Sequence, residues 1–404
     1  MKSAPNRWLI LTAAAIVNFV HGNPYIWTVF QPYVKEEYGL STAASSLPFT
    51  LIIGIFAAGN MAGGYLQHRL GARMTAFLGS LVMCAGFLLA AMAPRSMPWL
   101  ISLGYGILGG FGSGCAFAML TAVPQAWFPE RRGMVSGITI GMVGLSGILM
   151  NPLCDRLLAA FGYRAAMLWV TFIYAVLCLG IFFLREPGEA GAGSPAPRAG
   201  KAMGSGTAGM AGTGGMDPSQ DTRRQYTPRE MMRTRSFYII SLVYALAVPA
   251  YALVNPVMKS LGMERGLTDS AALLGVVAAS AANIAGRFAL PWLSDRTGRR
   301  RVLGATYLLC TVSTLGLVFA RGALFTVLSS AVCLVYGGVV SVFPVVVSDR
   351  FGTKYQGTNY GAAMIGYSIA SLLSPLLLSL AGQEASLVIT GLASLGGLFL
   401  LRFL

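Results

Sequence analysis

The sequence predicts an all-α integral membrane protein with twelve transmembrane helices arranged as two pseudo-symmetric six-helix bundles. Three observations support this: an apolar composition, twelve long apolar segments, and loop motifs that recur in both halves. Of the 404 residues, 55% are hydrophobic and only 11% are charged, and the mean hydropathy is +0.66. Because a soluble domain usually carries about twice that charged fraction, the composition favours a polytopic membrane protein.

Twelve segments are long enough to cross a bilayer, which needs about 20 mostly apolar residues. The first of them follows a short basic stretch without a small-residue cleavage site, so we interpret it as a span and not as a signal peptide. The candidate spans lie near residues 8–33, 46–67, 74–93, 98–127, 134–154, 165–184, 237–258, 270–293, 302–320, 323–348, 357–381 and 385–401.

A segment rich in Gly, Ala, Ser and Pro separates the sixth span from the seventh. Because it has almost no large apolar residues, it cannot build a core, and we predict a flexible linker over residues 185–228. The chain therefore divides into an N-terminal bundle, residues 1–184, and a C-terminal bundle, residues 229–404.

The basic residues are distributed unevenly across the predicted membrane. With the linker and both termini on one side, that side carries 21 of the 29 Lys and Arg residues. Basic residues mark the cytoplasmic side of bacterial-type membranes, so we expect a multi-pass protein of the inner (cytoplasmic) membrane with both termini cytoplasmic. The other side carries seven: Lys35, Arg95, Arg156, Arg164, Lys259, Arg265 and Arg321.

Two loop motifs recur at equivalent places in the two halves. G-Y-L-Q-H-R-L-G-A-R (64–73) follows the second span, and P-W-L-S-D-R-T-G-R-R (291–300) follows the eighth. R-R-G-M-V-S-G (131–137) and Y-Q-G-T-N-Y-G (355–361) follow the fourth and tenth spans. Such duplication is typical of transporters that work by alternating access.

The motif D-R-x-G-R-R with its degraded copy resembles the loop signature of the major facilitator superfamily. Further motifs resemble the oxalate:formate antiporter group within it, which also contains proton-linked monocarboxylate carriers. The resemblance covers all twelve spans and excludes the linker, and it implies the twelve-helix fold, an organic-anion substrate and a substrate-binding arginine at Arg287. The motifs are N-R-W-L at Asn6, W-F-P-E-R-R-G at Trp127, R-T-R-S-F-Y at Arg233 and F-G-T-K-Y-Q-G-T-N-Y-G at Phe351.

Arg287 is the one charged residue within residues 271–293. It lies eight residues, or about 12 Å, from Asp295 at the membrane boundary, hence near the middle of a ~30 Å core. That position costs about 2.5–3.5 kcal/mol, and none of the 14 acidic residues falls at the same depth. We therefore expect the substrate to supply the counter-ion, the alternatives being backbone carbonyls or snorkelling.

Asn283 lies one turn before Arg287 on the same helical face, so it can contact the same anion. Its alternative role is a hydrogen bond between helices.

The resemblance implies a lysine in the oxalate carriers of this group at the place where Tyr367 stands here. A single cation matches a monoanion better than a dianion, so the substitution favours a monocarboxylate. Further candidate binding residues are Tyr25, Phe117 and Tyr336, with Trp27 near Tyr25 on the first span. For each of these aromatic residues the alternative is ordinary helix packing, and Phe117 replaces a tyrosine that is common in the group.

His21 lies within the first span and is the candidate proton carrier, because histidine titrates near neutral pH. We favour the alternative of a neutral histidine hydrogen-bonded between helices. The following G-N-P sequence should loosen the helix at Pro24.

The motif P-W-L-S-D-R-T-G-R-R after the eighth span predicts a cytoplasmic gate of Asp295, Arg296 and Arg299. Asp295 can cap or pair across a helix end, and the arginines can reach nearby acids, which would stabilise the outward-facing state. In the first copy we assign Gly71 and Arg73 to the gate. There His68 replaces the aspartate, so this half should be weak or pH-sensitive.

The sequence thus predicts a secondary transporter of a small organic anion, driven by proton symport or anion exchange and acting as a monomer. A dicarboxylate antiporter is the alternative, and a membrane anion sensor without transport is the alternative of another class. We expect no enzymatic activity, cofactor, metal or nucleic-acid partner. The sequence has no phosphate-binding G-x-x-x-x-G-K-[ST] loop, and the six Cys residues are scattered singly.

Overall fold

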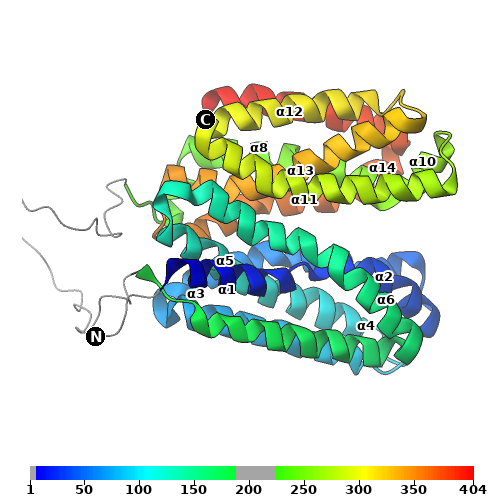
Figure 1. Cartoon of the computed structure of the whole chain (residues 1–404), viewed down its shortest axis with the longest axis horizontal. Coiled ribbons are helices and arrows are strands. Elements are labelled where there is room, and N and C mark those ends of the chain that lie inside the picture. Colours follow the sequence, from blue (N-terminus) through cyan, green and yellow to red (C-terminus); the bar gives the residue numbers. More distant parts are fainter. Residues whose placement is uncertain (1–5, 188–223) are drawn as a thin grey trace, which may run out of the picture.

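A computed structural model describes residues 6–187 and 224–404. Two helical bundles lie side by side, the first half of the chain in one and the second half in the other (Figure 1). The described segments that border residues 188–223 and the C-terminus lie at the same end of the molecule, which we call the linker end (Figure 1). Most of the predicted linker lies outside the described residues.

The first bundle is built from helices of very different length. Trp99–Ile101 continues into α5 through a π-helical stretch, Ser102–Leu108. The helices are α1 (Arg7–Val20), α2 (Asn23–Glu37), α3 (Thr42–Ala91), α4 (Trp99–Ile101), α5 (Gly109–Trp127) and α6 (Arg132–Cys178).

The second bundle begins at a capping box, in which Thr227 and Glu230 satisfy each other's backbone amides. Its helices are α7 (Pro228–Met232), α8 (Arg235–Leu246), α9 (Pro249–Val254), α10 (Met258–Glu264), α11 (Asp269–Thr297), α12 (Arg299–Gly316), α13 (Gly322–Phe351) and α14 (Gln356–Leu400).

Three of the long helices contain two membrane crossings each, joined at a glycine. Gly71 in α3, Gly162 in α6 and Gly382 in α14 have φ values of 78°, 74° and 75°. Side chains other than glycine rarely adopt this conformation, so the chain turns there within one residue. Eight helical stretches are long and apolar enough to cross a membrane. With the three paired crossings and the shorter α12, the described residues form twelve crossings in two bundles, which confirms the predicted fold.

The first and seventh crossings are both interrupted near the middle. α1 ends before Gly22, and α2 begins with proline in its first turn; α8 ends shortly before Pro249, which begins α9. Proline fits the first turn of a helix but not its interior, so these residues divide the two crossings at similar heights. The breaks place Tyr25 and Tyr251 on the segments that follow them.

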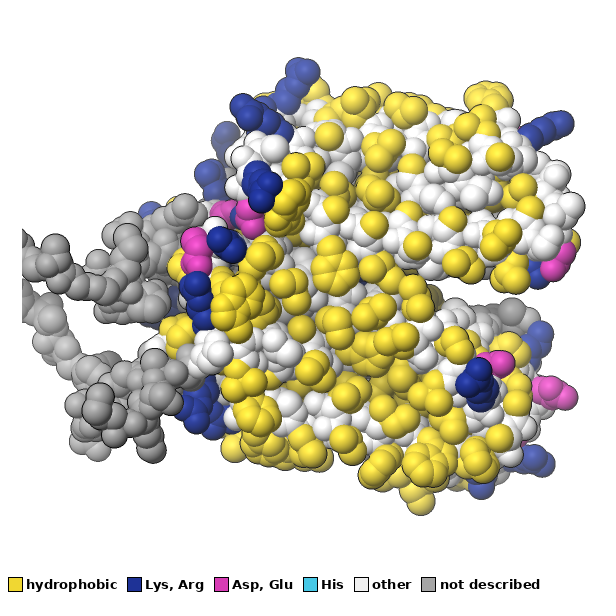
Figure 2. All heavy atoms as spheres, viewed as in Figure 1, with side chains coloured by type: hydrophobic (Ala, Val, Ile, Leu, Met, Phe, Trp, Pro, Cys, Tyr) yellow, Lys and Arg dark blue, Asp and Glu magenta, His cyan; other side chains and the backbone are white. Residues whose placement is uncertain are grey.

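Large apolar side chains cover the outside of both bundles, and charged side chains gather at the two ends (Figure 2). This distribution matches a hydrocarbon environment around the middle of the molecule. The two bundles touch closely at the linker end, where Gly64 of α3 lies against the backbone of Thr358 in α14. At the opposite end a gap separates them (Figure 2).

Candidate functional site

The side chain of Arg287 is buried between the two bundles and bonded only to neutral groups. It is 2% exposed. Its Nε donates to Asn283 Oδ1 (2.9 Å), Nη1 to the Ile140 carbonyl (3.1 Å) and Nη2 to the Tyr25 hydroxyl (2.6 Å). Ile140 and Tyr25 belong to the first bundle, so the guanidinium joins the two halves. Among the described residues, no carboxylate forms an ion pair with it.

The hydrogen bonds leave part of the guanidinium unused. A guanidinium has five N–H donors, and each terminal nitrogen carries two of them. Each terminal nitrogen of Arg287 makes one bond to a described residue. One donor therefore remains on each, and two donors match the two oxygens of a single carboxylate.

A cluster of tyrosines surrounds this arginine. The Tyr336 and Tyr367 hydroxyls lie 2.8 Å apart, and the Tyr251 ring stacks on that of Tyr336 with centroids 3.7 Å apart. The phenols of Tyr25, Tyr251, Tyr336 and Tyr367 all lie near the guanidinium, and the Tyr25 hydroxyl is bonded to it. The site thus combines one cation with several neutral hydroxyl groups.

Two glycines make the space that the arginine stem occupies. A Cβ on Gly144 of α6 would lie 3.0 Å from Arg287 Cδ. A Cβ on Gly337 of α13 would lie 3.2 Å from Arg287 Cγ and 2.0 Å from the Asn283 carbonyl oxygen. The close approach of helices α11 and α13 therefore requires glycine at residue 337, and it requires glycine at residue 286 as well, where a Cβ would lie 2.0 Å from the Leu334 carbonyl oxygen.

The remaining predicted aromatic residues, Phe117 and Trp27, are buried and pack against other rings. Phe117 contacts the ring edge of Phe56, with centroids 5.1 Å apart. Trp27 is buried, stacks at a tilt against Tyr105 and donates its Nε1–H to the Ser45 carbonyl. Asn283 is placed beside Arg287, where its side-chain oxygen orients the guanidinium.

His21 departs from the interpretation that the sequence favoured. It lies at the end of α1, is 3% exposed, and its ring meets that of Phe117 edge-on. Neither ring nitrogen has a hydrogen-bond partner among the described residues. The expectation of a histidine hydrogen-bonded between helices is therefore wrong, because the neighbouring ring offers no acceptor.

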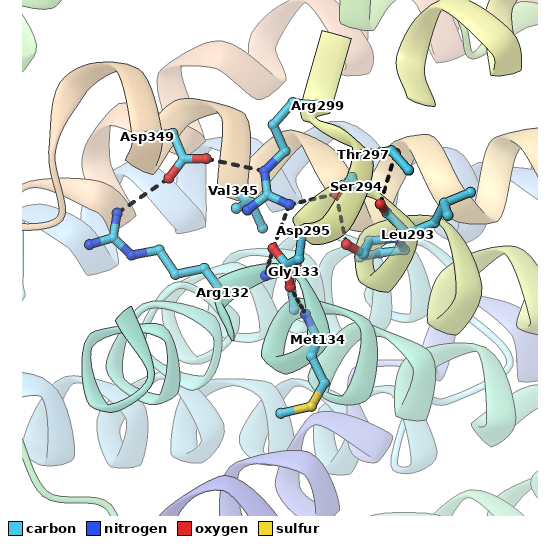
Figure 3. Close-up of polar contacts among 12 residues, drawn as sticks. Arg132, Gly133, Met134, Leu293, Ser294, Asp295, Thr297, Arg299, Val345 and Asp349 are labelled. Atoms are coloured by element: carbon cyan, nitrogen blue, oxygen red, sulfur yellow. Dashed lines mark hydrogen bonds and ion pairs between the residues drawn. The ribbon is translucent and has the colours of Figure 1, made fainter. Parts of the chain in front are cut away.

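A polar network closes the linker end of the molecule (Figure 3). The Asp295 carboxylate accepts the backbone N–H groups of Gly133 (3.0 Å) and Met134 (2.8 Å) at the start of α6. An anion is stabilised at the N-terminus of a helix, and here the anion and the helix belong to different halves. Arg299 pairs with the same carboxylate at 2.5 Å.

Two residues outside the predicted gate complete this network. Arg299 Nε pairs with Asp349 Oδ2 (3.1 Å), and Arg132 of the first half pairs with Asp349 Oδ1 (3.3 Å), as Figure 3 shows. We call Arg132, Asp295, Arg299 and Asp349 the ionic latch. The recurring R-R-G motif contains Arg132 and could have indicated it.

Arg296 does not take part in the latch. Its side chain is exposed and lies over the ring of Trp292, 3.9 Å from the centroid. It forms no ion pair within the described residues, so the expectation that it reaches an acid is wrong. Arg296 follows Asp295 directly in the helix, so its side chain points in a different direction around the helix axis, toward the outside of the bundle.

The first copy of the motif makes a neutral contact instead. Gly71 repeats the positive φ of Gly298, but Arg73 donates to the Leu184 carbonyl within its own half. His68 meets the ring of Tyr355, with centroids 4.7 Å apart, at the start of α14. Between the halves, Gln356 Nε2 donates to Gln125 Oε1 (2.8 Å). The two copies of the motif thus make contacts between the bundles at equivalent positions, but the contacts are ionic in one copy and neutral in the other.

Comparison with known proteins agrees with this architecture. The sequence profile of the Major Facilitator Superfamily matches residues 8–404. The chain belongs to this superfamily. A proton:xylose symporter, XylE, whose solved structure has 6-bromo-6-deoxy-D-glucose bound, superimposes with a TM-score of 0.74 at 15% identity, covering 97% of this chain and 94% of that one. This likeness shows the fold alone.

Two relatives come from the group that the motifs resemble. The oxalate:formate antiporter of Oxalobacter formigenes is 28% identical over 381 residues, which cover 91% of this chain and 83% of that protein. Human monocarboxylate transporter 11 is 25% identical over 293 residues, which cover 72% of this chain and 56% of that protein. The protein is accordingly a multi-pass membrane transporter of this superfamily.

Sequence reasoning missed Tyr251 in the tyrosine cluster. Pro249 marks a break in the seventh crossing that matches the break before Tyr25 in the first. The pseudo-symmetry of the two halves would have placed both tyrosines at the same depth.

Replacing Asp295 by Asn should loosen the linker end. The amide keeps one acceptor oxygen but loses the negative charge that attracts the start of α6 and Arg299. The closed form should lose about 2 kcal/mol of stability, which lowers the ratio of closed to open forms ~30-fold. Double electron–electron resonance between spin labels at exposed positions 131 and 300 should show a longer-distance population.

The matched control is Arg296→Gln, which should leave the distance distribution unchanged. An unchanged distribution in Asp295→Asn would mean that the latch does not hold the halves together.

Proposed function

We propose that the protein is a secondary transporter that carries a small organic monocarboxylate across the membrane by alternating access. The observation that carries this proposal is the buried guanidinium of Arg287, with no acidic partner among the described residues and one donor left on each terminal nitrogen. A carboxylate bound there would take up both donors and neutralise the charge.

The charge of the site favours one negative charge on the substrate. Removing an ion from water costs several kcal/mol unless a partner compensates it. Arg287 offers one positive charge, and the place of a second cation is taken by Tyr367, whose hydroxyl is already bonded to that of Tyr336. A dianion would keep one uncompensated charge in a site of low dielectric constant.

Exchange of a dicarboxylate is the second candidate. It is supported by the similarity to the oxalate:formate antiporter over 91% of this chain. In this case the tyrosine hydroxyls would have to stabilise the second carboxylate by hydrogen bonds alone, so we rank it below the monocarboxylate.

We further propose that the linker end is cytoplasmic and that the protein lies in the cytoplasmic membrane of a bacterial-type cell. The closed latch and the gap at the opposite end then correspond to an outward-facing transporter. An anion entering through this gap reaches a guanidinium that already touches both halves, so binding and rocking can be coupled at one point. A sensor would bind the anion without moving it, and counterflow of labelled substrate in proteoliposomes separates the two.

Arg287→Lys should weaken binding by at least about tenfold, because it keeps the charge but loses the planar pair of donors. Arg287→Gln should abolish uptake while the protein still inserts, since the change removes an unpaired buried charge. Ligand-induced thermal stabilisation and uptake into proteoliposomes measure the two effects. If Arg287→Gln binds the same anion with unchanged affinity, the site assignment is wrong.

Tyr367→Lys should shift selectivity toward dicarboxylates by at least about tenfold relative to monocarboxylates, because it places a second cation beside Arg287. The comparison uses a panel of acids of equal length with one or two carboxylates. Tyr360→Phe, which removes a hydroxyl paired with Tyr244, is the control and should leave the ratio unchanged. Equal selectivity in both variants contradicts the proposed charge match.

If protons are cotransported, His21 is the proposed carrier, because none of the 14 acidic residues is predicted at mid-membrane. His21→Gln should then abolish uptake driven by a pH gradient and spare anion exchange. Unchanged pH-driven uptake would remove His21 from the mechanism and leave exchange, or a proton carried on the substrate itself.

A further inference from the structure

A groove lies on the outer surface of the second bundle at the linker end, away from the site between the halves. Its volume is about 820 Å³. It follows the turn from α11 into α12, and its floor contains Gly298, Gly304 and Ala305, which have little or no side chain. The full lining is Thr297, Gly298, Arg299, Arg300, Arg301, Gly304 and Ala305.

Two arginines at this groove have no acidic partner in the part of the chain that the structure describes. Arg299 is engaged by Asp295 and Asp349 in the ionic latch. Arg300 and Arg301 are exposed and form no ion pair with any described residue. Figure 2 shows basic side chains gathered at this end of the second bundle. The groove therefore offers two guanidinium groups to an anion from outside.

The same face of α12 continues as an apolar stripe. Arg301, Ala305, Leu308 and Val312 follow one another at spacings of four, three and four residues, which places them on one side of the helix. Leu308 is 52% and Val312 58% exposed, and both lie in a crossing that faces lipid. The stripe is about 16 Å long, roughly one leaflet of a ~30 Å hydrocarbon core.

The space beneath the arginines is open. A Cβ on Gly304 would meet only Leu398, at 3.9 Å. A bulky group can therefore lie over Gly304 and Ala305 while it touches the arginines on one side and Leu308 on the other. The groove is continuous with the lipid-facing surface.

We propose that this groove binds an anionic phospholipid, with the phosphate on Arg300 and Arg301, the glycerol over Gly304 and Ala305, and an acyl chain along Leu308 and Val312. Charge complementarity selects an anionic headgroup, and the apolar stripe selects a lipid over a free anion. Trp292 lies at the neighbouring end of α11, and the Arg296 guanidinium lies over its ring. Tryptophan is enriched at the boundary between membrane and water, so Trp292 indicates that boundary near the groove.

The equivalent turn of the first half carries different residues. Counting from the equivalent turns at Gly71 and Gly298, Met74 stands at the place of Arg301. Arg73 stands at the place of Arg300, and its Nε is bonded to the Leu184 carbonyl. The duplication of the chain therefore provides a natural comparison, in which Arg301→Met gives the second half the residue of the first.

The test uses the purified full chain in detergent, titrated with dioleoylphosphatidylglycerol, dioleoylphosphatidylcholine or inorganic phosphate. Native mass spectrometry counts bound lipid, and the thermal midpoint reports stabilisation. Phosphatidylglycerol should bind tightly to the wild type, and Arg300→Gln with Arg301→Gln should weaken this binding about tenfold or more. Arg301→Met alone should weaken it by a smaller factor.

The matched control is Arg95→Gln with Arg156→Gln, which removes the same net charge from exposed positions at the opposite end. It should keep full lipid binding. An equal loss in this control shows attraction by net charge only and overturns the site. Equal stabilisation by inorganic phosphate or by phosphatidylcholine also overturns it, as does retained binding in the double arginine variant. Because the readout is lipid binding, these results are independent of the transported anion.

Discussion

The structure is organised around one buried positive charge. A guanidinium in the interior of a membrane protein is costly unless polar groups solvate it, and Arg287 obtains three hydrogen bonds from groups in both bundles. Gly144 and Gly337 give its stem room, and the breaks in the first and seventh crossings bring Tyr25 and Tyr251 beside it. These features are spread over the chain, and the arginine gives them a common physical reason.

Duplication of one six-helix unit explains the symmetry of the closure but not its chemistry. Both copies of the loop turn on a glycine with positive φ, and both reach the first turn of a helix in the opposite half. One side of the closure uses two carboxylates and two arginines, and the other uses an imidazole, a phenol and two amides. A carboxylate at a helix N-terminus is held by charge, whereas the neutral copy depends on packing and hydrogen bonds. The two sides of the closure therefore respond differently to salt and to substitution.

The charged residues fall into three physical classes according to their distance from water. Arg287 is fully enclosed and needs a substrate anion or neutral acceptors. The ionic latch is partly buried and fully paired. Arg300 and Arg301 stand at the edge of the bilayer, where water and lipid headgroups compete for them. In our proposals the same side-chain type acts as binding group, latch and membrane contact, and its surroundings decide which.

The sequence by itself determined the twelve crossings and their division into two halves, because these follow from apolar length and motif spacing. It indicated that Arg287 is buried, because this arginine stands alone in an apolar segment. It also placed Asp295 near a helix end. It contained Arg132 within a loop motif, but it could not show that Arg132 meets Asp349 or that Arg296 faces outward. Nor could it show that His21 has no partner, since these depend on which helices of different halves meet. Helical periodicity reports the direction of a side chain from its own axis, but only the packing of the bundles decides what lies in that direction.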